Sequence, residues 1–98
     1  MTVSKLADMI ITKLAIAFYK DGKETTDWNE LFTEFALNQE ELYQEAVELL
    51  VSDRLAEICY TDDVPCSVQI KPAAIKKEDE NTWLIKGYGF MKEIREWL

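Results

Sequence analysis

Residues 27–52 read DWNELFTEFALNQEELYQEAVELLVS, and this stretch decides the fold. Its apolar residues recur at steps of three and four, the period of a helix that buries one face. The pattern predicts a short helix over residues 25–35 and a longer helix that ends near residue 52, joined by a tight turn at residues 36–38. Two helices in this arrangement are typical of a helix-turn-helix unit.

Both helices begin with residues suited to cap a helix. Asp27 stands three positions before Glu30, the spacing of a capping box in which each residue satisfies a backbone N–H of the other. Asn38 and Glu41 repeat this spacing, so Asn38 is predicted to be the N-cap of the longer helix.

An apolar helix precedes this unit. Over residues 4–20 the apolar positions cover more than half of the helix circumference, and Gly22 is suited to a left-handed C-cap. Such a helix lies either at the centre of the core or against another subunit. The apolar residues that exceed the needs of one three-helix core are Met9, Ile16, Tyr19, Trp97 and Leu98. They predict a homodimer contact; the alternative is that they complete the core of a monomer.

After the longer helix the apolar period changes to two, which predicts a β-hairpin. Burying both apolar sets on one face places Ile58 opposite Val68. The same register places Ala56 opposite Ile70 and leaves a loop at residues 62–64.

The two cysteines of the chain belong to this hairpin. In the predicted register Cys66 faces the core opposite Tyr60, whereas Cys59 faces outward beside Ser67. The sulfur atoms are therefore expected on opposite faces, and a disulfide between them would require a register slipped by one residue. Two cysteines are too few for a secreted disulfide scaffold, so we expect a reduced, cytoplasmic protein.

Less regular sequence follows the hairpin. Pro72 ends the strand, and residues 76–81 are predicted to form a charged loop. Residues 83–85 predict a third short strand. A turn at residues 87–89 leads into a predicted terminal helix.

This order of elements resembles the winged helix-turn-helix superfamily over nearly the whole chain. Residues 40–58, EELYQEAVELLVSDRLAEI, resemble the family's recognition helix running into the first wing strand. Residues 84–91, LIKGYGFM, look like the family's common tail, a Leu-Thr-x-x-Gly pattern before a last helix. The resemblance implies one α+β domain over residues 1–98: a three-helix bundle with a helix-turn-helix, a β-hairpin wing and a C-terminal helix.

Members of this superfamily usually bind duplex DNA, with the second helix of the motif in the major groove and the hairpin on phosphates. Carried over, the resemblance implies a transcription regulator. Its implied recognition-helix contacts are Asn38, Gln39, Tyr43 and Gln44. Its implied wing contacts to phosphate are Lys71, Lys76, Lys77 and Lys86. For these lysines the alternative is a mixed, solvated loop, because acidic residues 78–80 stand beside them.

The charge distribution favours a different partner. The net charge is −8, and residues 21–54 hold ten acidic against two basic residues, which accounts for all of that excess. Four glutamates lie on the predicted recognition helix, and no lysine or arginine follows its start before Arg54. Phosphate repels such a helix. The charge therefore predicts a non-catalytic module that contacts protein through this helix, with DNA binding as the alternative.

The sequence argues against catalysis and bound cofactors. It has no histidine, so Ser-His and Cys-His pairs and the usual proton shuttle at neutral pH are missing. Cysteines on opposite hairpin faces make no zinc site, and Gly87-x-Gly89 lacks the third glycine of a dinucleotide loop. We expect no metal and no small-molecule cofactor. We also expect no membrane span, because the apolar run over residues 9–18 is short and interrupted by Lys13.

Overall fold

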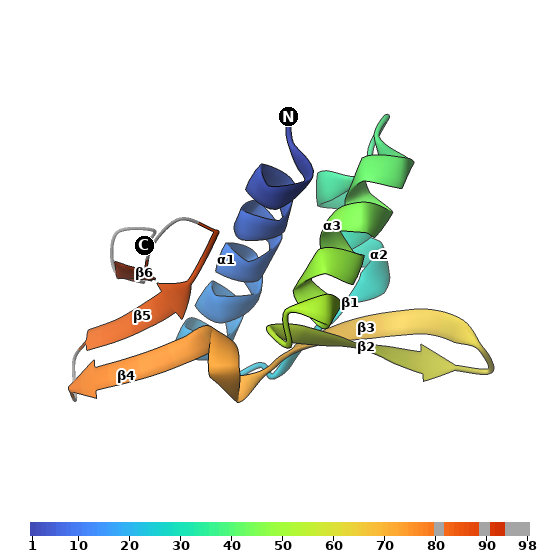
Figure 1. The fold of residues 1–98 in the computed structure, drawn as a ribbon. Helices are drawn as coiled ribbons and strands as arrows, with labels where there is room; N and C mark the ends of the chain where they lie inside the picture. The colour runs from blue at the N-terminus through green and yellow to red at the C-terminus, as the bar shows by residue number, and fades with distance from the viewer. Residues whose placement is uncertain (80–81, 89–90, 94–98) are drawn as a thin grey trace.

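Two long helices form the centre of the fold, where α1 (Val3–Asp21) packs along α3 (Glu40–Ser52). The computed structural model describes residues 1–79, 82–88 and 91–93 (Figure 1). Within these ranges the other elements are β1 (Thr25–Asp27), α2 (Trp28–Phe35), β2 (Ala56–Thr61), β3 (Val64–Ile70), the 3-10 helix η1 (Pro72–Ala74), β4 (Ile75–Asp79), β5 (Thr82–Lys86) and β6 (Met91–Glu93). The described part of the chain is a small α+β domain with three α-helices and an antiparallel hairpin sheet.

Both ends of α1 are capped. The hydroxyl of Thr2 accepts a hydrogen bond from the backbone N–H of Lys5 at 3.2 Å. Gly22 takes the left-handed conformation with φ 66°, and its N–H donates to the carbonyl of Phe18 at 3.0 Å. The predicted C-cap is therefore confirmed at the residue type that adopts this conformation most easily.

The second helix, α2, begins three residues later than the apolar pattern predicts. Residues 25–27 form the edge strand β1 instead, in which Thr26 pairs with Val68 of β3. Threonine is β-branched and fits a strand well. Pairing with β3 supplies the backbone hydrogen bonds that these residues would otherwise have made within a helix. Asp27 caps α2 as predicted, because its carboxylate accepts a hydrogen bond from the N–H of Glu30 at 3.1 Å.

The start of α3 differs from the prediction. The N-cap residue is Gln39, and no side chain makes a capping hydrogen bond there. The side-chain amide of Gln39 donates instead to the carbonyl of Phe35 at 2.9 Å, which closes the turn between α2 and α3. Leu37 holds φ 29° within this turn. The prediction that Asn38 caps α3 is wrong, because Asn38 lies in the turn itself and is exposed.

Over residues 56–59 the hairpin register is the one predicted from burying both apolar sets. β3 lies between β1 and β2 in an antiparallel sheet. Ile58 pairs with Val68 and Ala56 pairs with Ile70. Ala56, Val68 and Ile70 are buried, so this face of the sheet covers the helices.

A β-bulge interrupts the hairpin towards its tip. Cys59 pairs with Ser67, but Tyr60 pairs with Pro65, so Cys66 is an extra residue on β3. The extra residue shifts the register and leaves Cys66 exposed. The predicted core-facing position of Cys66 opposite Tyr60 is therefore wrong.

The turn of the hairpin is shorter than predicted. Asp62 and Asp63 form a two-residue turn, with φ 52° and 64°, the conformation that two-residue hairpins of this handedness require. Aspartate tolerates this backbone better than most residues because its side chain is short and polar. Val64 belongs to β3, so the three-residue loop predicted at residues 62–64 is wrong.

A second antiparallel sheet of β4, β5 and β6 lies beside α1, and the hairpin of β2 and β3 extends in the opposite direction (Figure 1). β5 confirms the strand predicted at residues 83–85. The charged loop predicted over residues 76–81 is wrong at residues 76–79, which belong to β4. Ile75 of β4 pairs with the buried Ile85 of β5. This apolar pair anchors the otherwise charged strand β4 against β5.

The predicted terminal helix is wrong at residues 91–93, which form β6 and pair with β5. Hydrogen bonding to β5 satisfies the backbone of this segment in place of a helical turn. The rest of that predicted helix, residue 90 and residues 94–98, lies outside the described residues.

Aromatic contacts join α3 to α2. The ring of Tyr43 meets the ring of Trp28 at 5.3 Å and 67° and that of Phe32 at 5.7 Å and 86°, both edge-to-face. Tyr43 is 0% exposed, and its hydroxyl has no hydrogen-bond partner among the residues that the structure describes. Burial raises the pKa of Tyr43 to about 12.

Tyr43→Phe is expected to leave the free energy of unfolding unchanged or to raise it by up to about 1 kcal/mol, because the variant removes a buried hydroxyl that makes no hydrogen bond. The wild-type protein should also lose stability as the pH rises from 10 towards 12. Unfolded Tyr43 ionises near its ordinary pKa of 10.0, whereas folded Tyr43 ionises only at about 12. The variant lacks this contribution.

Urea denaturation near neutral pH and at several values above pH 10 measures both effects. A variant that is less stable than wild type by more than about 1 kcal/mol near neutral pH would mean that the hydroxyl has a partner.

Candidate functional site

The side of α3 that faces solvent is acidic. We define the acidic face as the exposed glutamates Glu40, Glu41, Glu45 and Glu48. They lie along one helix because its core-facing positions, at steps of three and four, are occupied by the buried residues of α3. No lysine or arginine lies on α3, so these carboxylates have no cationic neighbour on their own helix.

A hollow of about 610 Å³ opens beside the first turn of α3, lined by residues 37–42 and Glu45. Leu37 stands at its edge and is 72% exposed, the most exposed large apolar side chain in the described part of the chain. Its φ of 29° belongs to the turn before α3, which holds the side chain out of the core. The hollow therefore combines apolar surface with carboxylates, and the sequence did not single out Leu37.

The structure separates the four residues implied as recognition-helix contacts. Asn38 and Gln44 are exposed, and Gln39 is half-buried with its amide bound to the carbonyl of Phe35. Tyr43 lies in the core, wholly covered. The groove-facing position implied for Tyr43 is therefore wrong, because its ring fills the space between α3 and α2.

The lysines implied as wing contacts are not gathered on the hairpin. Lys71, at the end of β3, pairs with Glu57 of β2 at 3.1 Å. Lys76 and Lys86 are exposed on β4 and β5, in the sheet beside α1. The side chain of Lys77 lies outside the described residues.

The hairpin tip carries acidic and apolar side chains instead. Asp62 and Asp63 form its turn, and Tyr60 and Val64 beside them are 60% and 62% exposed. A tip of this composition repels phosphate in the same way as the acidic face does.

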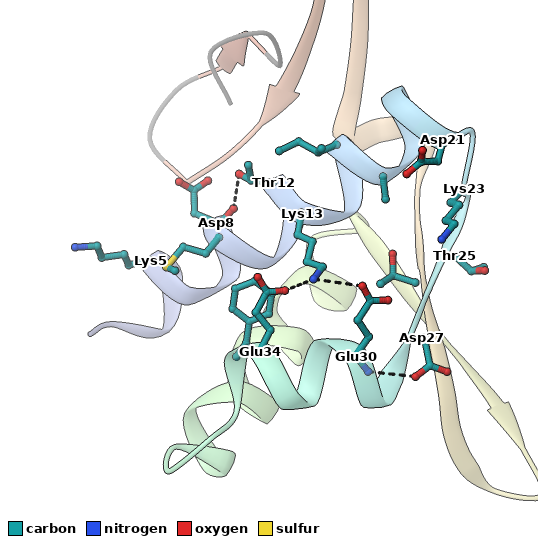
Figure 2. Close-up of a pocket in the computed structure, with 15 residues that line it drawn as sticks. Lys5, Asp8, Thr12, Lys13, Asp21, Lys23, Thr25, Asp27, Glu30 and Glu34 are labelled. Atoms are coloured by element: carbon teal, nitrogen blue, oxygen red, sulfur yellow. Dashed lines mark hydrogen bonds and ion pairs between the residues drawn. The ribbon is translucent and has the colours of Figure 1, made fainter. Parts of the chain in front are cut away.

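A groove of about 940 Å³ runs between α1, α2 and β1 (Figure 2). Met9, 43% exposed, and half-buried Ile16 line it from α1. These two are among the residues predicted as dimer contacts. Tyr19, also predicted there, is half-buried and packs against the core. Trp97 and Leu98 lie outside the described residues.

Lys13 crosses this groove from α1 to α2. Its ammonium group lies 3.5 Å from the carboxylate of Glu30 and also pairs with that of Glu34 (Figure 2). Partial burial by itself lowers the pKa of Lys13, but the two carboxylates outweigh it, so the pKa is raised from 10.5. Lys13 is therefore charged at neutral pH and neutralises part of the acidity of α2.

Among the described residues, no group of three or more His, Cys, Asp or Glu side chains is arranged to hold a metal ion. No helix in the same part of the chain is long and apolar enough to cross a bilayer.

No family model, curated protein sequence or solved structure matches this chain.

Proposed function

We propose that this chain is a non-catalytic binding module of the winged-helix type, whose acidic face and neighbouring hollow receive a basic protein partner. The order of α1, α2, α3 and the β2–β3 hairpin supports the winged-helix assignment. The observation that carries the choice of partner is the acidic face itself, because four exposed carboxylates stand where a DNA-binding relative would present its groove-reading helix.

Electrostatics separates the two classes of partner. A duplex presents a dense row of phosphates, and carboxylates on the approaching helix raise the energy of that contact. A basic protein surface gains from the same carboxylates through faster association and better specificity. Of the four implied DNA contacts, Tyr43 is buried in the core and Gln39 is half-buried. Only Asn38 and Gln44 are exposed.

The hollow indicates the kind of side chain that fits. Exposed Leu37 offers apolar contact, and Glu41 and Glu45 offer carboxylates one helical turn apart. An arginine matches both, because its stem packs on apolar surface and its planar head donates two parallel hydrogen bonds to a carboxylate. A leucine beside that arginine would cover Leu37.

The test uses a helical peptide that presents arginine and leucine side chains on one face, titrated into the isotopically labelled full chain and followed by amide chemical shifts. We expect shifts concentrated at residues 37–48 and an affinity that falls as salt is added. The control peptide replaces each arginine with glutamine and should bind much more weakly. Shifts centred on Lys76 and Lys86, or equal binding of both peptides, would contradict the proposal.

A second proposal concerns self-association through the α1 groove. Met9 and Ile16 supply apolar surface there, and in a dimer with a twofold axis each copy would cover these side chains with its own. Sedimentation equilibrium of wild type and Met9→Lys tests this. We expect a dimer for wild type and a monomer for the variant; a monomeric wild-type chain would contradict the proposal.

A further inference from the structure

Hydrogen bonds hold the Cys66 side chain beside Cys59 on the neighbouring strand. The Cys66 thiol donates to the backbone carbonyl of Cys59, with the two atoms 3.3 Å apart. Its sulfur also accepts a hydrogen bond from the hydroxyl of Thr61 at 3.4 Å and lies 3.9 Å from that of Ser67. Thr61 shares a face with Cys59, two residues away on β2, and Ser67 lies directly opposite Cys59. The Cys66 sulfur therefore sits among the side chains of the Cys59 face.

The β-bulge explains this placement. In a regular hairpin closed by Asp62 and Asp63, Cys66 would pair with Cys59. The bulge moves Ser67 into that position and makes Cys66 the extra residue, so Cys66 and Ser67 both oppose Cys59. A bulge re-aims the side chain of its extra residue, which here turns towards Cys59.

We propose that Cys59 and Cys66 are a thiol pair that closes to an intramolecular disulfide across the bulge by exchange with a low-molecular-weight disulfide such as glutathione disulfide. The inference does not depend on the proposed partner of the acidic face. Cys66 is exposed and Cys59 half-buried, so a small disulfide reaches Cys66 first.

The exchange has two steps. The Cys66 thiolate attacks one sulfur of glutathione disulfide, forming a mixed disulfide and releasing one glutathione thiolate. The Cys59 thiolate then attacks the Cys66 sulfur, forming the Cys59–Cys66 bond and releasing the second glutathione. The two thiol protons of the protein pass to the two released glutathiones, so the protein is oxidised by two electrons and glutathione disulfide is reduced by the same number.

The full chain is incubated with mixtures of reduced and oxidised glutathione, quenched with acid and weighed by mass spectrometry. We expect wild type to lose the mass of two hydrogen atoms while remaining a single chain. Cys59→Ser, which keeps the exposed thiol, should accumulate one glutathione adduct. Stable glutathione adducts on wild type, or disulfides between chains, would overturn the proposal.

Cysteines close together in sequence also pair in an unfolded chain, so the test compares folded and unfolded protein. The ratio of closed to open wild type at a fixed glutathione mixture gives an effective concentration of one thiol at the other. We expect this value to be at least about tenfold higher in buffer than in concentrated urea, which corresponds to about 1.4 kcal/mol of added folding stability. A value in buffer equal to or below that in urea means that the fold holds the thiols apart.

The double variant Cys59→Ser with Tyr60→Cys is the matched control. It moves one thiol by a single residue, to the other face of β2. Tyr60, which the new cysteine replaces, is 60% exposed and does not belong to the core. Sequence separation hardly changes, so closure in urea should match wild type. In buffer we expect the control to close less readily than wild type, and equal closure would show that the bulge does not select the pair.

Discussion

Ile10→Ala is expected to lower the free energy of unfolding by about 3 kcal/mol. Ile10 is 0% exposed in the middle of α1, the helix that packs along α3 at the centre of the fold. The substitution removes buried methyl and methylene groups and leaves a cavity that the surrounding helices fill only in part. Small domains are stable by about 5–15 kcal/mol, so this single change removes a large share of the total.

Val51→Ala is the control, at an apolar position of α3 that is 38% exposed and lies outside the α1 groove. It should cost less than about 1 kcal/mol, because a half-exposed side chain gives up little buried area. Urea denaturation followed by tryptophan fluorescence measures both values. Equal losses for the two variants would mean that α1 does not present the Ile10 side to the core.

Glu41→Lys with Glu45→Lys is expected to weaken binding of the arginine-leucine peptide by about 100-fold. The two carboxylates lie one turn apart beside the hollow. Their reversal replaces attraction with repulsion at the positions where the arginines of the peptide would sit. A loss of about 2.8 kcal/mol corresponds to this factor, in the range expected when two like charges are brought together at an interface.

Glu24→Lys with Glu57→Lys changes the net charge by the same amount at exposed positions outside both the hollow and the α1 groove. Isothermal titration calorimetry of both double variants separates the local effect from the change in overall charge. The control should lose no more than about threefold in affinity, since screened charges at a distance contribute weakly. Equal losses would show that net charge, and not the acidic face, attracts the peptide.

Local chemistry explains what the sequence predicts well. Gly22 and Asp27 cap helices through their own backbone freedom and side-chain reach, so their roles are visible without a fold. The pairing of Ile58 with Val68 follows from burying alternate residues, because a slip of one residue would expose the whole apolar set.

The incorrect predictions arise where a residue has two compatible environments. Tyr43 lies three or four residues from Ala46 and Val47 on the buried side of α3, and this helical spacing is the signal that it belongs to the core. Its hydroxyl group suggested a polar contact instead. The bulge at Cys66 had one sign in Pro65, which lacks the N–H that a regular ladder needs.

The second sheet could not be inferred from local patterns. Residues 76–79 are charged, and they form β4 because β5 offers backbone partners and the buried Ile85 gives Ile75 an apolar neighbour. The acidic face was visible in the sequence as a run of glutamates, whereas exposed Leu37 depended on a turn with a positive φ that no residue type at that position signals.

Fluorescence anisotropy of a labelled random-sequence duplex tests most directly whether the acidic face excludes DNA. The duplex is titrated at low salt with the full chain, on a sample whose mass is known from light scattering. The acidic face and the acidic hairpin tip predict no rise in anisotropy up to tens of micromolar protein. A rise that disappears steeply as salt is added would show that this chain presents a basic surface to DNA, and would contradict the assignment of the acidic face to a protein partner.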